Sequence, residues 1–401
     1  MGNYHPDAHF VKQLDRDVAA FIQGSSAYQS DERFNELALR EFELLYRSSE
    51  PYREYCNRKK LSPPTITHWS EIPAVSSFPF RKDLSVSSSL PDTGEFSYQS
   101  GVVGLGRRRG PIFPDKDTRA LTSMANYMHA KSFLFPDIDK IEMLLMVPSP
   151  LMAPGMVMAS GLDQMMKRFG TWESRFLISF RGLKLKALMR SLRHAEKSGQ
   201  PVALLGATFV IDYFLDACEG QGILFKLPEE SRVVDSGGFM GRYTKCTKEE
   251  YFAKCRKMLG VREEFCVNAL WICESSSVYF DNTLKNACSG LAAERLKELP
   301  PWTRVIAVDT RNFRNLPKGN LGLLRLYDLT NRAMAFAVQT DKMGYETGNG
   351  FEVVGKWDRH VGAEDIDRSP QHPGGKAVTK VMDFFMRRKL SKLGEMYSGV
   401  K

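Results

Sequence analysis

The sequence lacks the features that would place it in a membrane or outside the cell. Within its 401 residues, no apolar run approaches the roughly 18 residues needed to cross a bilayer, and the polar N-terminal segment has no signal peptide pattern. The seven cysteines are scattered singly, without the paired spacing of a metal site or a disulfide framework. We therefore expect a cytoplasmic protein without a membrane span and with reduced thiols.

A basic face rich in aromatic residues is also missing, although the net charge is +9. The only dense basic cluster is Arg107–Arg109, and the run Arg387–Lys389 is typical of an ordinary basic helix. A nucleic-acid-binding surface would combine basic residues with exposed aromatics, so we expect no nucleic-acid partner. The positive charge favours smaller anions or acidic partners, such as nucleotides, acyl-phosphates or acidic carrier proteins.

What the sequence does contain is an alternation of helical and strand patterns. Helical spacing is found at 8–23 and 31–60 and again at 117–134, 161–169, 181–198, 208–219, 247–259 and 283–298. Apolar runs predict strands at Ile141–Val147, Val202–Phe209, Arg232–Asp235, Cys266–Cys273, Arg304–Asp309, Leu321–Tyr327 and Phe351–Val354. This alternation predicts an α/β protein with helices packed on a largely parallel sheet.

Two of these strands end in residues suited to bind a ligand. The strand before Ser236 runs into the glycine pair Gly237 and Gly238, and the strand from Cys266 leads to the single carboxylate Glu274. Glycines let a flat or phosphorylated ligand approach the main chain, because no Cβ excludes it. Open α/β sheets bind their ligands at the carboxyl ends of strands, where Glu274 would lie.

In order and spacing, these segments resemble the bacterial long-chain acyl-protein synthetases (LuxE-like) of the luminescence fatty-acid reductase system, a branch of the adenylate-forming enzymes. The resemblance runs through most of the chain, and no single motif is decisive. The matching segments are Phe34–Arg40, Pro51–Cys56, Trp69–Val75, Val234–Arg242, Asn268–Asn282, Pro300–Arg304, Gly319–Leu329, Thr340–Asp341 and Gly350–Lys356.

The resemblance implies an organisation and an activity. It implies an adenylate-forming α/β core at 91–356 with mixed, largely parallel sheets, after an N-terminal helical region at 1–90 and before a short C-terminal segment at 357–401, a vestigial lid. The activity would be that of a ligase that uses ATP and Mg²⁺ to turn a medium- or long-chain carboxylic acid into an acyl-adenylate. Because no cysteine follows Cys288, the acyl acceptor would be external: a carrier or reductase-type protein, coenzyme A or an amine.

The resemblance also assigns residues to Mg²⁺ and to the phosphates. Glu274 would hold Mg²⁺, which usually takes only one or two protein carboxylates. Ser100, Gly101 and Gly104 would form the phosphate loop, whose backbone amides can bind anions. Two hydroxyl positions of that loop are Val102 and Val103 here, so Arg107–Arg109 would have to compensate.

The remaining assignments concern the nucleoside and the hinge. Ser236, Gly237 and Gly238 would flank the adenine, and Asp341 would accept hydrogen bonds from the ribose hydroxyls. Lys356 occupies the position of the superfamily's hinge arginine. Lysine keeps the positive charge but lacks the planar guanidinium group of arginine.

Each assignment has a structural alternative. The glycine pair could be an ordinary tight turn, Asp341 a turn residue, Glu274 a surface carboxylate and the 100–109 segment a surface loop. The methionines between Met143 and Met166 would line an acyl site or simply fill the core. Trp271 stands where the family has a small residue and would narrow the space for the acid or the adenine.

Two alternatives for the function stay open as well. Because the phosphate loop has lost hydroxyls, the chain could be a catalytically degenerate relative that acts as a binding or complex-forming subunit. It could also be an acyl- or aryl-CoA ligase of similar fold.

Overall fold

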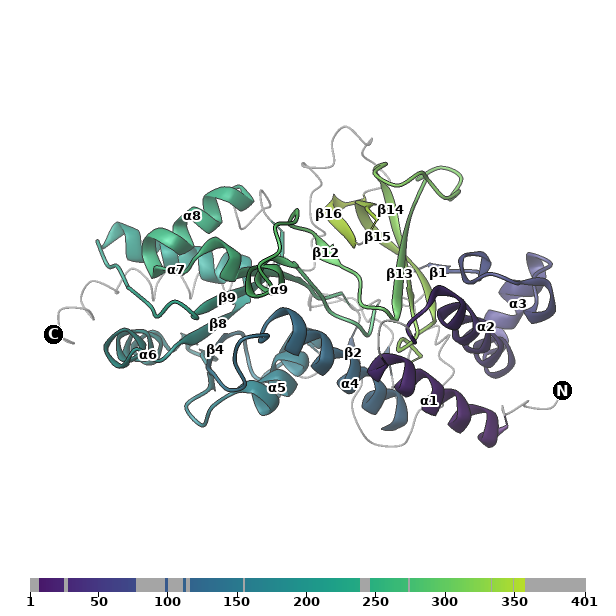
Figure 1. Ribbon diagram of the computed structural model, residues 1–401, viewed down its shortest axis with the longest axis horizontal. Helices are drawn as coiled ribbons and strands as arrows, with labels where there is room; N and C mark the ends of the chain where they lie inside the picture. The colour runs from purple at the N-terminus through teal and green to yellow at the C-terminus, as the bar shows by residue number, and fades with distance from the viewer. Residues whose placement is uncertain are drawn as a thin grey trace.

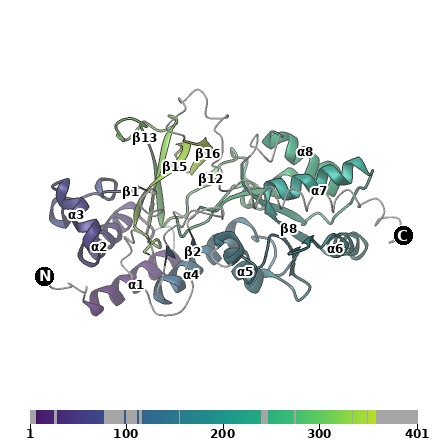
Figure 2. The same ribbon diagram turned by 180° about the vertical axis from the view of Figure 1, so that it is seen from behind.

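Two six-stranded sheets with surrounding helices make up the described part of the chain (Figure 1; Figure 2 gives the view from behind). The computed structural model describes residues 7–24, 28–76, 98–99, 111–112, 116–153, 156–238, 246–272, 275–332, 334–348 and 350–357. None of the helices in these ranges combines the length and the apolar character needed to cross a bilayer.

The first sheet is parallel except at one edge. Its strand order is β11-β10-β9-β8-β4-β5, and only the β10–β11 pair is antiparallel. Parallel strands covered on both faces are apolar along their whole length, which explains runs such as Val202–Leu205. The strands are β4 Glu142–Met146, β5 Arg175–Phe176, β8 Val202–Ala207, β9 Arg232–Ser236, β10 Cys266–Leu270 and β11 Tyr279–Phe280.

Helices lie on both sides of this sheet. In Figures 1 and 2, α7 and α8 lie above the strands and α5 lies below them. Helix α8 starts at a capping box between Thr247 and Glu250, and it ends at Gly260, which adopts the left-handed conformation. The helices of this half are α5 Val157–Phe169, α6 Leu185–Ser198, α7 Thr208–Gly220, α8 Lys248–Leu259 and α9 Thr283–Cys288, with the 3₁₀ turn η4 Glu263–Phe265 and the hairpin of β6 Ile178–Ser179 and β7 Gly182–Leu183.

The second sheet is mainly antiparallel. Its order is β12-β16-β15-β14-β13, and the short β1 pairs in parallel with β15. Its strands are β1 Val75–Ser76, β12 Lys297–Glu298, β13 Thr303–Val308, β14 Gly322–Asp328, β15 Ala337–Glu346 and β16 Gly350–Lys356.

The N-terminal helices pack against the second sheet. Buried residues of α1 and α2, such as Phe21 and Phe34, share one hydrophobic cluster with Tyr327 of β14 and Val338 of β15. Helix α4 contributes Leu121 to the same cluster and Phe133 to the core of the first sheet, so it connects the two halves. The elements are α1 Ala8–Gln23, α2 Asp31–Ser48, α3 Glu50–Arg58, η1 Pro63–Thr65, η2 Trp69–Glu71, α4 Lys116–Phe133 and the pair β2 Tyr98–Gln99 and β3 Pro111–Ile112.

The predicted α/β fold is confirmed, and the first sheet has the expected parallel strands. The strands predicted at 304–309, 321–327 and 351–354 differ, because they belong to the mainly antiparallel second sheet, whose strands do not need helical crossovers. Two of the predicted helices also differ. The pattern at 31–60 is divided at Ser49, which caps α3 through its hydroxyl. The pattern at 283–298 is helical only to Cys288, because Gly290 takes a positive φ of 66° and the chain then enters β12. The strand β15 was not predicted, and it contains Thr340 and Asp341.

The predicted division into 1–90, 91–356 and 357–401 stays a prediction. The first boundary falls within 77–97 and the last segment begins at Trp357, so both lie at or outside the edges of the described residues.

A buried ion pair joins the N-terminal helices to the second sheet. Arg332 follows β14, and its Nε lies 2.9 Å from both carboxylate oxygens of Glu41 in α2. Its Nη2 lies 2.6 Å from Glu41 Oε1, and its Nη1 pairs with Asp15 of α1. Arg332 is 6% exposed and Glu41 is 4% exposed, so little solvent can replace either partner.

We predict that Arg332→Ala destabilises the protein by about 3–5 kcal/mol, because the change leaves the Glu41 carboxylate buried without its bidentate partner. Urea denaturation at neutral pH measures the loss. The control is Arg58→Ala, because Arg58 is 70% exposed and its pairing with Glu54 at 4.0 Å should contribute less than about 1 kcal/mol. Equal losses in the two variants would contradict the role of the buried pair.

Candidate functional site

The carboxyl ends of β9 and β10 lie side by side and place two predicted segments together. Asn268 of β10 pairs with Asp235 of β9 in parallel register, so both strands end at the same edge. Ser236–Gly238 continues from β9, and Trp271 and Ile272 continue from β10. The residues on either side of Glu274 therefore lie at the same edge as the glycine pair, although residues 273–274 themselves are outside the described ranges.

The turn after β9 requires glycine. Gly237 has a φ of 143°, and a Cβ on it would lie 3.0 Å from the Thr208 hydroxyl oxygen at the start of α7. Gly238 is exposed, and a Cβ on it would meet no atom within 4 Å. One glycine is thus needed for close packing on α7, and the other leaves main chain open to a ligand.

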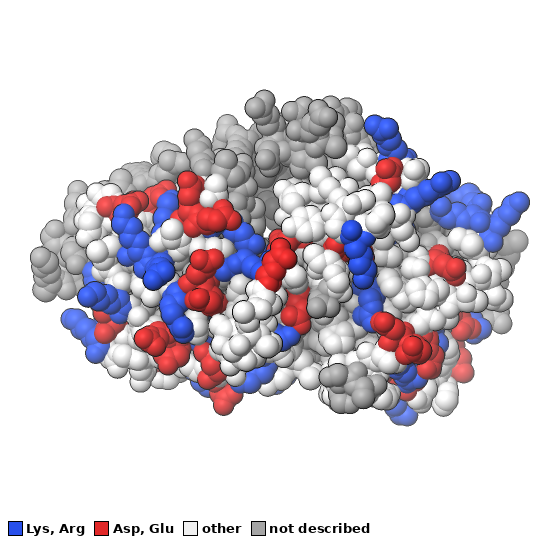
Figure 3. All heavy atoms as spheres, turned by 45° about the horizontal axis from the view of Figure 1, so that its top comes forward, with Lys and Arg blue, Asp and Glu red and all other residues white. Residues whose placement is uncertain are grey.

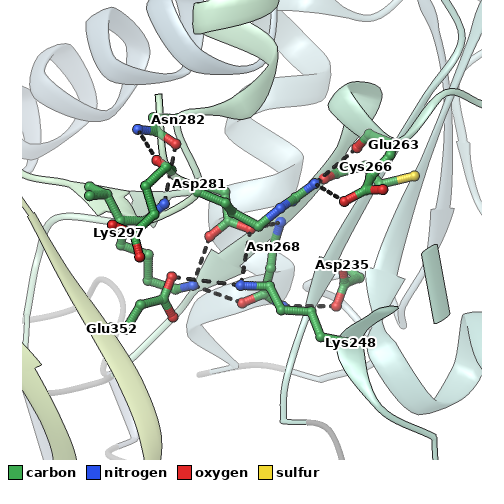
Figure 4. Close-up of polar contacts among 12 residues, drawn as sticks. Asp235, Lys248, Glu263, Cys266, Asn268, Asp281, Asn282, Lys297 and Glu352 are labelled. Carbon is green, nitrogen blue, oxygen red and sulfur yellow. Dashed lines mark hydrogen bonds and ion pairs between the residues drawn. The ribbon is translucent and has the colours of Figure 1, made fainter. Parts of the chain in front are cut away.

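A chain of buried polar groups extends from Asp235, which lies two residues before Gly237 (Figure 4). The Thr208 hydroxyl and the Asn268 amide both donate to Asp235 Oδ2, at 2.5 and 2.8 Å. Asn268 Oδ1 accepts from Lys297 Nζ of β12 at 3.0 Å, and the same Nζ lies 3.0 Å from Asp281 Oδ1.

The chain of contacts continues into the second sheet. Arg295 Nη1 lies 3.1 Å from Asp281 Oδ2, and Lys248 Nζ lies 3.9 Å from the same oxygen. Lys248 also lies 3.6 Å from Glu352 of β16, as Figure 4 shows. We call Asp235, Asn268, Lys297, Asp281, Arg295, Lys248 and Glu352 the polar chain.

Burial and neighbouring charges give the acids of the polar chain different pKa values. Burial raises the pKa of Asp235 to about 6, and its Oδ1 has no hydrogen-bond partner among the described residues. Burial acts in the same direction on Asp281, but the cations Lys297, Lys248 and Arg295 outweigh it and lower the pKa of Asp281. Asp281 is therefore ionised at neutral pH.

A cavity of about 110 Å³ opens beside the segment after β10. It is bounded by α4, α5, residues 271–272 and 275–278, and by Asn331 and Met334 after β14. Trp271 and Ile272 on one side of Glu274, and Ser275 on the other, all line it. The cavity and the candidate Mg²⁺ ligand thus belong to the same segment of chain.

The second sheet fixes the loop after Glu274. The Ser275 hydroxyl and the Ser277 backbone amide both donate to Asp328 Oδ2 of β14, at 3.0 Å each. The Trp302 indole donates to the Ser277 hydroxyl at 3.1 Å. Asp328 is 1% exposed, so these contacts are shielded from water. Sequence reasoning matched the segment around Asp328 but assigned the residue no role, because its partners lie far away in the chain.

Two further predicted site residues, Asp341 and Lys356, belong to strands of the second sheet. Asp341 is in β15, is 1% exposed and lies 2.7 Å from Lys342 Nζ, so its alternative as a turn residue is wrong. Lys356 ends β16 and pairs in register with Lys342. The phosphate-loop residues Ser100, Gly101 and Gly104, like Glu274, lie outside the described ranges.

The methionines between Met143 and Met166 lie partly in the core and partly at the cavity. Met143 and Met146 are buried in the core of the first sheet, whereas Met165 lines the cavity.

Within the described ranges, no cluster of three or more Asp, Glu, His or Cys side chains is arranged to hold a metal ion. A single carboxylate such as Glu274, together with phosphate oxygens, still meets the preference of Mg²⁺ for hard oxygen ligands. Figure 3 shows acidic and basic side chains interspersed on one face of the described residues, without a large patch of one sign.

The chain shares its family and its fold with known proteins. The family model for the acyl-protein synthetase LuxE matches residues 20–354. No curated protein sequence matches the chain. Among solved structures, an open conformation of 2-hydroxyisobutyryl-CoA ligase in complex with 2-HIB-AMP and CoA has a TM-score of 0.56 at 10% identity, and the match covers 80% of this chain and 68% of that chain.

The same ligase in its thioesterification state has a TM-score of 0.56 at 10% identity, with 89% of this chain and 70% of that chain covered. At this identity the likeness concerns the fold alone. It confirms the predicted adenylate-forming α/β fold.

We predict that the pKa of Asp235 makes folding stability depend on pH. Its pKa in the folded state, about 6, exceeds the ordinary value of 3.8, so the folded state binds the proton more tightly. Stability is therefore highest below about pH 4 for this group and falls as the pH rises through 6. Since each pKa unit is worth about 1.4 kcal/mol, the loss should approach about 3 kcal/mol.

Asp235→Asn tests this dependence, because an amide cannot ionise and its oxygen can still accept from Thr208 and Asn268. Urea unfolding of wild type and variant from pH 4 to pH 7 should show the variant gaining about 3 kcal/mol relative to wild type. Asp117→Asn, at an exposed carboxyl of α4, is the control for losing one acid. A difference that does not change with pH would show that burial does not perturb Asp235.

Proposed function

Because the chain belongs to the LuxE acyl-protein synthetase family and has the fold of an adenylate-forming ligase, we propose that it activates a carboxylic acid with ATP and transfers the acyl group to an external thiol or amine. A carboxylate oxygen of the acid attacks the α-phosphorus of ATP, pyrophosphate leaves, and an acyl-adenylate results. The acceptor then attacks the acyl carbon and AMP leaves.

One observation supports this function above the others: the glycine turn and the cavity flank the same strand edge. A nucleotide on Gly237 and Gly238 and an acid in the cavity would meet at the segment that contains Glu274. In this arrangement Glu274 would hold Mg²⁺, which neutralises charge on the phosphates when bound. We assign the adenine to Ser236–Gly238.

The second sheet and the phosphate loop would supply the remaining contacts. We assign the ribose to Asp341, the hinge to Lys356 and the phosphates to Ser100, Gly101 and Gly104. Asp341 and Lys356 lie on the neighbouring strands β15 and β16, and β16 is the last described strand before the C-terminal segment.

The described cysteines support an external acceptor. Six of them are free, and only Cys288 is exposed. Burial raises the pKa of Cys56 and of Cys246 to about 11, so neither is a thiolate at neutral pH. Burial also raises the pKa of Cys288. A carrier or reductase-type protein, which the family implies, or coenzyme A, which the ligase structure contains, would supply the thiol.

The proposal also includes the cellular location of the protein and the identity of its carboxylic acid substrate. Dependence on ATP favours the cytoplasm. The family suggests a medium- or long-chain fatty acid, and a panel of acids in a hydroxamate-trapping assay, with and without thiol acceptors, tests the acid and the acceptor together.

We predict that Glu274→Ala lowers acid-dependent ATP–pyrophosphate exchange by about 10²–10³-fold, because one group that stabilises charge on the reacting phosphates is lost. The fold should be unchanged in circular dichroism and thermal unfolding. Glu54→Ala, which removes an exposed carboxylate of α3, is the control. Unchanged exchange in Glu274→Ala would remove this residue from the mechanism.

The second candidate function is a non-catalytic binding or complex-forming subunit, which Val102 and Val103 in the phosphate loop favour. Nucleotide binding separates the two. We predict that ATP with Mg²⁺ at 100 times its dissociation constant stabilises the folded state by about 2.7 kcal/mol, measured as a rise in the unfolding temperature. An unfolding temperature that does not respond to ATP and Mg²⁺ would favour the non-catalytic subunit.

A further inference from the structure

Trp271 and Gly161 fit against each other at the wall of the cavity. A Cβ on Gly161 of α5 would lie 2.0 Å from Cζ3 and 2.5 Å from Cη2 of Trp271. No side chain larger than hydrogen is compatible with this contact, so the indole ring lies directly against the backbone of α5. The half-buried Trp271 also packs against the core of the first sheet. Its ring therefore has a defined position and takes up space that a ligand would otherwise use.

The cavity that remains is small. Its volume is about 110 Å³, whereas an apolar cavity of about 150 Å³ holds one benzene molecule and sites for drug-sized ligands measure about 300–1,000 Å³. A straight alkyl chain of medium length is larger than this space and would have to extend out of the cavity. Removal of the Trp271 ring would enlarge the cavity along α5.

The lining of the cavity is mainly apolar, with a smaller polar part. The polar part includes Arg119, Arg168, Ser123, Ser160 and Gln164, and none of the described lining residues is acidic. Hydroxyl and amide groups covered by an alkyl chain would lose water without gaining a hydrogen-bond partner, which is unfavourable. Hydroxyl, oxo or carboxylate groups on a ligand would instead accept hydrogen bonds from them.

We infer that Trp271, packed on Gly161, restricts the site to short carboxylic acids, and that Arg119 and Arg168 favour those with a further polar group, such as hydroxy, oxo or dicarboxylic acids. This inference rests on the proposed function, because it places the acid in the cavity beside Glu274. It differs from the medium or long chain that the family resemblance implies.

The experiment measures kcat/KM in ATP–pyrophosphate exchange with two sets of acids: short hydroxy, oxo and dicarboxylic acids, and straight-chain acids from butyrate to myristate. The wild type should prefer the first set. Trp271→Gly should raise kcat/KM for the longer straight-chain acids by at least about 10-fold, as expected for opening a pocket by more than a methylene group. Trp271→Leu should shift the preference in the same direction by less.

The matched control is Trp172→Gly, which removes an indole ring that is 90% exposed and is not among the residues lining the cavity. Its acid preference should equal that of the wild type. Thermal unfolding of each variant shows whether it is folded, and Trp271→Leu keeps the test valid should Trp271→Gly fail to fold.

Acid binding, measured by calorimetry without ATP, separates this inference from the proposed function. Selective binding of short polar acids without any exchange would overturn the proposed function and support the inference. Exchange that is best with long straight-chain acids, or a preference unchanged by both Trp271 substitutions, would overturn the inference alone. Neither binding nor exchange with any acid would overturn both.

Discussion

The buried ion pair between Lys297 and Asp281 is the contact on which the arrangement of the two sheets depends. Lys297 is 3% exposed and Asp281 is 0% exposed, so both charges are removed from water, which is costly unless each charge is fully paired. Asn268 of the first sheet and Arg295 complete the pairing. Few alternative positions of β10 relative to β12 would satisfy all of these groups, so the polar chain favours one placement of the strand edge that holds the glycine turn.

Beside the cavity, hydrogen bonds instead of ion pairs hold the loop after Glu274. Asn126 of α4 donates to the Ser276 carbonyl oxygen at 2.9 Å and accepts from the Val278 amide at 3.0 Å. Asp328 holds Ser275 and Ser277 from the opposite side. The loop after Glu274 is thus fixed by a helix and by a strand of the second sheet, as a site requires when its reacting groups must be held in place by a supporting layer.

The sequence predicted the parts of the fold that local pattern determines. Apolar runs identified β4 and β8, and the glycine pair marked a turn that Gly237 makes with a positive φ. The strand β15 escaped prediction because Gln339–Lys342 is a polar run, and only the tertiary fold buries Gln339, Thr340 and Asp341. The contacts of Trp271 with Gly161 and of Asp328 with Ser275 escaped for a related reason: each joins segments that only the tertiary fold brings together. The family resemblance supplied the proposed roles of Glu274 and Asp341, and the local pattern alone could not have done so.

The acids near the strand edge also explain how an anionic ligand could approach it. Lys297, Lys248 and Arg295 surround Asp281 and balance its negative charge. ATP and a carboxylate substrate are both anions, and unbalanced acids beside them would repel them strongly in a site shielded from water. Arg119 and Arg168 at the cavity add positive charge where the acid would enter. The overall charge of +9 acts in the same direction at longer range, so the local and the global electrostatics both favour anionic substrates.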